Sequence, residues 1–256
     1  MHELERRIRN AAAMGRTAVI PFITAGFPTP ADFWRHFSDI DQAGADIIEI
    51  GVPFSDPVAD GPVVEEASRR ALAAGITLAD ILADLTVRRP QAAVVLMGYY
   101  NPFLQYGLKK LAREAHRAGV SGLIIPDLPI DEAGELMAAL AEYDIALVPL
   151  VGPNTGIERM RLYSEGAKGY AYVVSVMGIT GERKNLAPAV AETMRRARSV
   201  FAVPLALGFG LSHPRQLADL PQEAMPDAAV IGSALLRHID SGTAAGSFLK
   251  CWLGDA

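Results

Sequence analysis

The sequence predicts a (β/α)8 TIM barrel, an α/β fold, with one extra helix at the N-terminus. Short apolar runs rich in β-branched residues alternate with amphipathic stretches rich in Ala, Leu, Glu and Arg. The apolar runs show little polar alternation, which is typical of strands covered on both faces and therefore of a parallel sheet. Eight such strand–helix units in 256 residues match the content of one barrel, so we expect residues 1–256 to form a single domain.

The element boundaries follow from these runs. The expected strands are Ala18–Thr24, Ile47–Gly51, Ala93–Met97, Leu123–Pro126, Ala146–Leu150, Tyr170–Val174, Val203–Gly208 and Ala228–Ile231. The expected helices are Pro30–Ala43, Pro62–Ala73, Leu78–Arg88, Phe103–Ala118, Asp131–Tyr143, Gly156–Glu165, Pro188–Ser199, His213–Leu220 and one that begins at Ser233.

Glycine recurs where a predicted helix ends and the next strand soon begins. Gly44, Gly119 and Gly166 each stand at such a joint, where glycine adopts the left-handed cap conformation without a Cβ penalty. The repeated strand–helix–glycine unit supports the barrel. An open doubly wound sheet is the structural alternative, although no linker or change of composition divides the chain.

Composition narrows the class of protein. A formal net charge of −5 offers no electrostatic reason to bind nucleic acid. No apolar run approaches the ~20 residues of a membrane span, and the N-terminal stretch lacks the apolar core of a secretory signal. Cys251 has no second cysteine to pair with, which fits a reducing compartment. We therefore expect a cytoplasmic globular protein.

Two common kinds of site find little support. The glycines of Gly208–Gly210 lack the third glycine of a dinucleotide fingerprint, since His213 stands in its place, and they follow the seventh strand rather than the first. The five histidines are dispersed without the spacing of metal ligands, so no metal site is predicted.

Active sites of barrels lie at the carboxyl ends of the strands. Glu49 stands between Ile48 and Ile50 in a predicted strand, so it points into the barrel if the isoleucines face the helices. Burial would raise its pKa toward neutrality and suit it to give and take a proton. A structural glutamate paired with a cation is an equally good interpretation of these residues alone.

The loop after that strand carries two more carboxylates. Asp56 and Asp60 each stand beside a turn-forming Pro or Gly, where aspartate usually accepts local backbone hydrogen bonds. Two carboxylates in one pocket can take different roles when their environments differ. The spacing does not establish that Asp60 reaches the pocket.

Glycines also end the seventh and eighth strands, at Gly208–Gly210 and at Gly232 before Ser233. A helix N-terminus after a glycine favours an anion, and these two loops commonly hold phosphate in this fold. The alternative is that Gly and Ser merely end a strand and cap a helix. The long segment Ser175–Asn185, with Gly178 and Gly181, reads either as a lid over substrate or as a solvated connection.

Together these segments resemble the tryptophan synthase alpha chain family. Ile48–Gly61 matches the family signature along its whole length. The resemblance continues through Pro21–Gly26, Tyr99–Pro102, Pro126–Pro129, Gly178–Gly181, Gly208–Gly210 and Gly232–Ala234, in order and over nearly the whole chain.

The resemblance implies a lyase that cleaves indole-3-glycerol phosphate to indole and glyceraldehyde 3-phosphate by a retro-aldol reaction. It implies Glu49 as the general acid/base and Asp60 as the acceptor of the indole N–H. The implied substrate residues are Phe22, Tyr99, Ile124, Tyr172, Thr180 and Phe209, and the implied phosphate residues are Gly181, Gly210, Gly232 and Ser233.

The resemblance also implies a beta-chain partner in an α2β2 complex, with Asp56 and Pro57 toward that partner. It implies no cofactor in this chain and pyridoxal phosphate in the beta chain. Two features depart from the family pattern, namely Met177 in the lid and the proline-interrupted stretch Ala218–Pro226. A free-standing lyase and a catalytically silent activator of the partner are the alternative functions.

Overall fold

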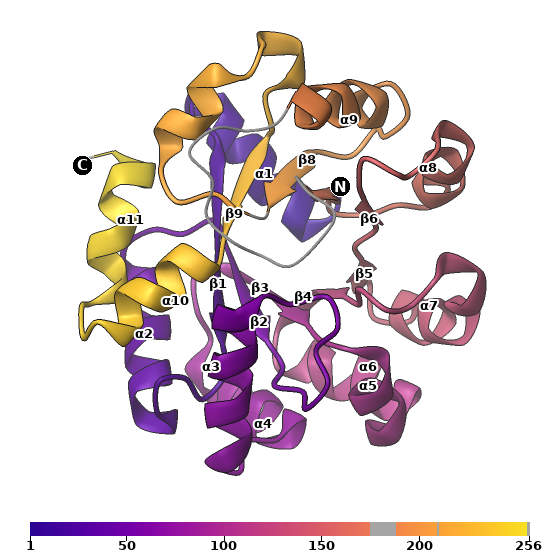
Figure 1. Cartoon of the computed structure of the whole chain (residues 1–256). Coiled ribbons are helices and arrows are strands. Elements are labelled where there is room, and N and C mark those ends of the chain that lie inside the picture. The colour runs from indigo at the N-terminus through magenta and orange to yellow at the C-terminus, as the bar shows by residue number, and fades with distance from the viewer. Residues whose placement is uncertain (175–187, 209, 255–256) are drawn as a thin grey trace.

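The computed structural model describes residues 1–174, 188–208 and 210–254. Its strands curl around a central axis and its helices surround them, so that the chain forms a TIM-barrel-like α/β fold (Figure 1). Within the described residues, no helix is long and apolar enough to cross a membrane.

All strand pairs in this part of the chain are parallel. The strands are β1 (Ala18–Thr24), β2 (Ile47–Gly51), β3 (Ala93–Met97), β4 (Val120–Ile124), β5 (Ala146–Leu147), β6 (Leu150–Val151), β7 (Ala171–Val174), β8 (Leu205–Gly208) and β9 (Ala228–Ile231). Their order in the sheet is β5-β4-β3-β2-β1-β9-β8-β7-β6.

The two outermost strands of this order, β5 and β6, are halves of one barrel strand that was expected to be continuous. They are separated by Val148 and Pro149, because proline has no N–H to donate to a ladder. The backbone still bridges the break: Val148 N donates to Leu123 O at 2.9 Å, and Pro149 O accepts from Tyr172 N at 2.9 Å. The fifth barrel strand therefore joins the two ends of the sheet.

The helices lie outside the strands, except α1, which lies across one end of the barrel (Figure 1). They are α1 (Glu3–Ala13), α2 (Pro30–Gln42), α3 (Pro62–Ala73), α4 (Leu78–Arg88), α5 (Tyr100–Tyr106), α6 (Leu108–Arg117), α7 (Gly134–Ala141), α8 (Ile157–Ser164), α9 (Pro188–Arg198), α10 (Ser233–Asp240) and α11 (Ala245–Leu253). The 3-10 helices of the described chain are η1 (Ile130–Glu132), η2 (Pro214–Asp219) and η3 (Gln222–Ala224).

Several predicted boundaries were wrong for identifiable reasons. The fourth strand begins at Val120, not Leu123. The helix expected over 103–118 is divided at Gly107, whose φ of 92° no helix accommodates. The helix expected over 213–220 is 3-10 instead, and Leu220 is extended because it precedes Pro221.

Other predictions are confirmed. The extra N-terminal helix is α1, and the helix expected from Ser233 is α10. The three joint glycines all have positive φ, at 90°, 76° and 77° for Gly44, Gly119 and Gly166.

Helix α1 closes the amino-terminal end of the barrel through one side chain. Leu4 is fully buried, and a Cβ added to Gly122 on β4 would lie only 2.8 Å from Leu4 Cδ1. Gly169, just before β7, leaves the same side chain room, since a Cβ there would lie 3.1 Å from it. Leu4 therefore fills the space that these glycines leave open, and the barrel is packed at this end.

Two aspartates at the same end each bind an arginine and a backbone N–H of the neighbouring strand. Asp46, which precedes β2, accepts both ends of the Arg16 guanidinium at 2.6 and 2.8 Å and the Val19 N–H of β1 at 2.8 Å. Asp227, which precedes β9, likewise accepts from Arg198 at 2.6 Å and from Leu205 N of β8 at 2.7 Å. Asp46 thus joins the start of β1 to the start of β2, and Asp227 joins the start of β8 to the start of β9.

We predict that Asp46→Ala lowers the free energy of unfolding by about 3–5 kcal/mol, because it leaves a half-buried guanidinium and a buried N–H without their acceptor. Urea unfolding measures the change. Lys168→Gln is the control, since it breaks an exposed pair with Asp144 and should cost at most about 1 kcal/mol. Equal losses in the two variants would show that the Asp46 contacts stabilise the fold no more than an exposed ion pair does.

Candidate active site

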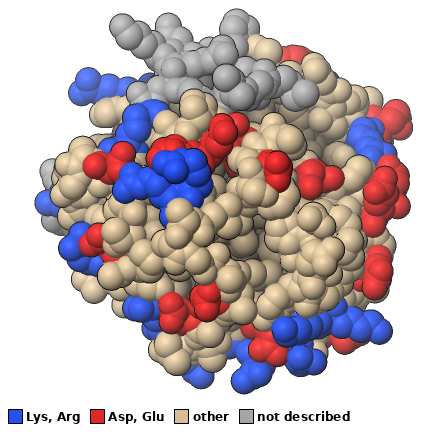
Figure 2. All heavy atoms as spheres, turned by 60° about the horizontal axis from the view of Figure 1, so that its bottom comes forward, with Lys and Arg blue, Asp and Glu red and all other residues tan. Residues whose placement is uncertain are grey.

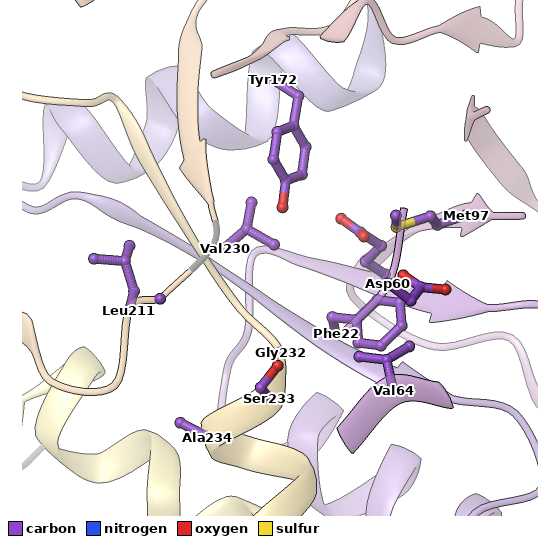
Figure 3. Close-up of a pocket in the computed structure, with 12 residues that line it drawn as sticks. Phe22, Asp60, Val64, Met97, Tyr172, Leu211, Val230, Gly232, Ser233 and Ala234 are labelled. Atoms are coloured by element: carbon purple, nitrogen blue, oxygen red, sulfur yellow. The ribbon is translucent and has the colours of Figure 1, made fainter. Parts of the chain in front are cut away.

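A pocket of about 490 Å³ opens at the carboxyl ends of the strands (Figure 3). It is lined by Phe22, Glu49, Asp60, Val64, Met97, Tyr172, Gly210, Leu211, Val230, Gly232, Ser233 and Ala234. These residues come from elements spread over the whole barrel, from β1 to the start of α10. In Figure 3, Tyr172 points into the pocket opposite Asp60 and Phe22, while Gly232 and Ser233 form another wall.

Glu49 occupies the interior of the barrel, as the flanking isoleucines predict. Its position on β2 pairs with Phe22 of β1 on one side and Val95 of β3 on the other. The side chain is 1% exposed, and Oε2 has no hydrogen-bond partner among the described residues. Burial, with a smaller contribution from the charge of Asp60, raises the pKa of Glu49 to about 8. At neutral pH this carboxyl group therefore carries a proton.

Asp60 reaches the same pocket from the loop that follows β2. Burial raises the pKa of Asp60 to about 6, although a hydrogen bond from Tyr99 opposes the shift. Tyr99 Oη donates to Asp60 Oδ2 at 3.2 Å and accepts from Ala59 N at 2.9 Å. The Tyr99 ring also stacks on Phe54, with centroids 5.1 Å apart. One tyrosine thus anchors the loop that carries Asp60, which is mostly ionised at pH 7.

The opposite wall presents backbone donors. Helix α10 begins at Ser233, and its N-cap Gly232 provides no side-chain cap. The first N–H groups of the helix therefore have no partner within the helix, and the helix dipole favours an anion in front of them. Gly210 and Leu211, after β8, stand beside this helix end on the pocket wall. Together they make a site that suits a phosphate group.

The structure brings most of the predicted site residues together. Phe22, Glu49, Asp60, Tyr172, Gly210, Gly232 and Ser233 all line the pocket. Tyr99 reaches the site through its hydrogen bond to Asp60. Ile124 is fully buried at the end of β4 and is absent from the pocket lining.

The remaining predicted residues fall into two groups. Thr180, Gly181 and Phe209 lie outside the described residues. Asp56 is exposed and Pro57 half-buried on the outer side of the loop after β2. Among the described residues, no group of three or more His, Cys, Asp or Glu side chains could hold a metal ion.

Sequence reasoning missed five apolar wall residues, namely Val64, Met97, Leu211, Val230 and Ala234. Met97 could have been found, because it is the last residue of a predicted strand, at the carboxyl end where barrel sites lie. Leu211 and Ala234 are neighbours of the predicted glycine and serine positions. Val64 lies on a helix, where no strand periodicity points to the pocket.

Comparison with known proteins identifies the family. The sequence profile of the tryptophan synthase alpha chain family matches residues 8–248. The chain belongs to this family. It is 63% identical to the tryptophan synthase alpha chain of Desulfovibrio desulfuricans, covering 98% of this chain and 100% of that one. It is 40% identical to the alpha chain of Caldanaerobacter subterraneus, over 94% of this chain and 92% of that one.

The fold agrees with solved members of the tryptophan synthase alpha chain family. A structure of Mycobacterium tuberculosis tryptophan synthase is similar with a TM-score of 0.89 and 32% identity, covering 99% of both chains. The alpha subunit from Legionella pneumophila gives a TM-score of 0.85 at 29% identity, covering 98% of this chain and 97% of that one.

We predict that Glu49→Gln makes the protein more stable than the wild type at alkaline pH. The pKa of Glu49 is about 8 in the folded protein and ordinarily 4.5. Between these values the folded chain holds a proton that the unfolded chain has released, so wild-type stability falls as pH rises, by up to about 1.4 kcal/mol per pH unit. The variant lacks this loss. Urea unfolding at pH 4.5, 6, 7 and 8 should show a gap that widens with pH.

The control is Glu135→Gln on the exposed face of α7, which should leave the pH profile of stability unchanged. A gap between Glu49→Gln and wild type that stays constant from pH 4.5 to 8 would contradict the assigned protonation of Glu49.

Proposed function

We propose that this chain cleaves indole-3-glycerol phosphate, the known reaction of its family, with Glu49 and Asp60 as the two reacting carboxyl groups. The observation that carries the assignment of residues is their pairing in one pocket with different proton affinities. The pKa of Glu49 is about 8 and that of Asp60 about 6. At pH 7 one therefore offers a proton and the other a negative charge.

Glu49 acts first as an acid. Its proton goes to C3 of the indole ring, which leaves the ring positively charged at nitrogen. The resulting Glu49 carboxylate then takes the proton of the hydroxyl on the adjacent side-chain carbon. That oxygen becomes the aldehyde oxygen, the carbon–carbon bond breaks, and its electron pair returns to the ring to form neutral indole. Glu49 ends the cycle protonated, as it began. Positioned proton transfer of this kind supplies about 10²–10⁴-fold.

Asp60 stabilises the charged ring. Its carboxylate accepts the indole N–H, whose positive charge develops when C3 is protonated. A preorganised partner of this kind is worth roughly 3–4 kcal/mol in a site that excludes water. The hydrogen bond from Tyr99 keeps Asp60 oriented and opposes its protonation. Phe22 and Tyr172 supply aromatic walls for the indole and its side chain.

The phosphate group binds at the other wall. Gly210, Gly232 and Ser233 contribute backbone N–H groups, together with the start of α10. The family resemblance adds Gly181 to this site, and Ile124, Phe209 and the lid residue Thr180 to the substrate contacts.

The family assignment implies a beta-chain partner. We assign an α2β2 complex in which indole passes to a beta chain that holds pyridoxal phosphate, while this chain holds no cofactor. Asp56 and Pro57 lie on the surface expected to face that partner. We also assign a cytoplasmic location. The proposed single domain over residues 1–256 is supported by the strands from Ala18 to Ile231, which all share one sheet.

We predict that Glu49→Gln reduces indole release by at least about 10²-fold while substrate still binds, because the amide keeps the shape but cannot donate this proton. Indole formation from indole-3-glycerol phosphate, with and without a beta chain, measures the activity. Calorimetry with the same substrate measures binding. Glu135→Gln is the control and should retain full activity. Equal indole release by Glu49→Gln and wild type would refute the role of Glu49.

We predict that Ser233→Glu raises KM for indole-3-glycerol phosphate at least about tenfold, because a carboxylate beside the phosphate costs several kcal/mol. Ser233→Ala is the matched control. It keeps the backbone N–H and should change KM little. An unchanged KM for Ser233→Glu would place the phosphate elsewhere in the pocket.

A further inference from the structure

The turn that forms one half of the phosphate wall is itself held by a buried side chain. Residues 210–213 are the described part of the connection from β8 to η2, and Gly210 adopts a φ of +83°, which few residues other than glycine tolerate. A turn of this shape keeps its backbone donors aimed at a ligand only if something fixes it. Gln216, on η2, is 6% exposed and lies behind the turn.

Gln216 makes hydrogen bonds to three residues of this turn. Its Oε1 accepts from Ser212 N at 2.7 Å and from His213 N at 2.9 Å, and also from the Ser212 hydroxyl at 3.3 Å. Its Nε2 donates to Gly210 O at 3.2 Å. One amide thus uses both its acceptor and its donor on a single short stretch of backbone.

These contacts exceed what is needed to cap η2. A reciprocal cap is present, in which His213 Nδ1 accepts from Arg215 N at 3.2 Å and Gln216 Oε1 accepts from His213 N. Within such a cap, the Gln216 side chain bonds only to the N-cap residue, His213. The bonds to Ser212 and Gly210 extend past it, toward the pocket.

The same bonds limit which N–H groups of the turn remain available to a ligand. Ser212 N and His213 N are occupied by Gln216 Oε1. Leu211, which is buried on the pocket wall, donates its N–H to none of the described residues. A buried N–H without an acceptor is costly, so an anionic oxygen of a ligand is a suitable partner for this group.

We propose that Gln216 is a positioning residue for the phosphate group of the substrate: its amide holds the 210–213 turn so that Leu211 N faces the phosphate beside the start of α10. This inference rests on the proposed function and adds a residue to its phosphate site. Glutamine suits the task better than glutamate, because a carboxylate cannot donate to Gly210 O and would place a negative charge behind a site for an anion.

Two variants and two ligands test the proposal. Gln216→Leu removes all the amide contacts, and Gln216→Glu keeps the acceptor but loses the donor to Gly210 O. The probes are glycerol 3-phosphate, which shares only the phosphate end of the substrate, and indole, which shares only the ring. Thr155→Val is the matched control, since it removes a bond to Gly152 N in the loop after β6, away from the pocket.

In both Gln216 variants we expect affinity for glycerol 3-phosphate to fall about tenfold or more and affinity for indole to stay within about twofold. KM for indole-3-glycerol phosphate should rise with kcat within about threefold, as when binding common to ground and transition state is lost. Thr155→Val should bind both probes like wild type.

Three outcomes would overturn the proposal. If wild type binds glycerol 3-phosphate and both variants bind it equally well, Gln216 does not position the site. If the variants lose indole and glycerol 3-phosphate alike, the residue only supports the fold. If wild type itself fails to bind glycerol 3-phosphate, the proposed function fails and this inference with it.

Discussion

The site depends on one constraint, which is that a carboxyl group stays buried without a cation. Glu49 is enclosed by the barrel, and none of the described residues that line its pocket is Lys, Arg or His. A nearby cation would lower the pKa of Glu49 and remove the proton that the chemistry needs. The pocket wall proposed to bind phosphate also leaves the Glu49 proton in place, because it offers neutral backbone donors and a helix dipole and no charged side chain among the described residues.

The acidic groups that stabilise the fold and those proposed to react lie at opposite ends of the barrel. At the amino-terminal end, Asp46 and Asp227 are each paired with an arginine and a backbone N–H, so their charges are satisfied. At the carboxyl end, Glu49 and Asp60 share a pocket whose described lining residues include no cation. On the face seen in Figure 2, basic and acidic side chains are interspersed without one dominant sign.

Much of this arrangement could be predicted from sequence, because it follows from local periodicity. Alternation around Glu49 placed it inside the barrel, and the glycine before Ser233 marked a helix N-terminus on the pocket wall. What failed depends on backbone details that periodicity does not report. Pro149 divides a strand while leaving the barrel continuous, and Pro221 prevents a regular helix before it.

Contacts between elements were also beyond sequence reasoning. Tyr99 was expected to contact the substrate, but sequence reasoning did not predict that its hydroxyl donates to Asp60 and accepts from Ala59 N. Gln216 carried no signal at all, because a polar residue in a predicted helix is ordinarily solvated. Its importance is visible only when the turn after β8 folds back over it.

The central claim is that Glu49 holds its proton at neutral pH, and a direct titration tests it. Carbon-13 NMR of protein labelled at the glutamate side-chain carboxyls, with the Glu49 resonance assigned by its loss in the glutamine variant, reports the protonation of this one group. The account predicts a midpoint near pH 8. A midpoint near 4.5, the ordinary value for a glutamate, would contradict it.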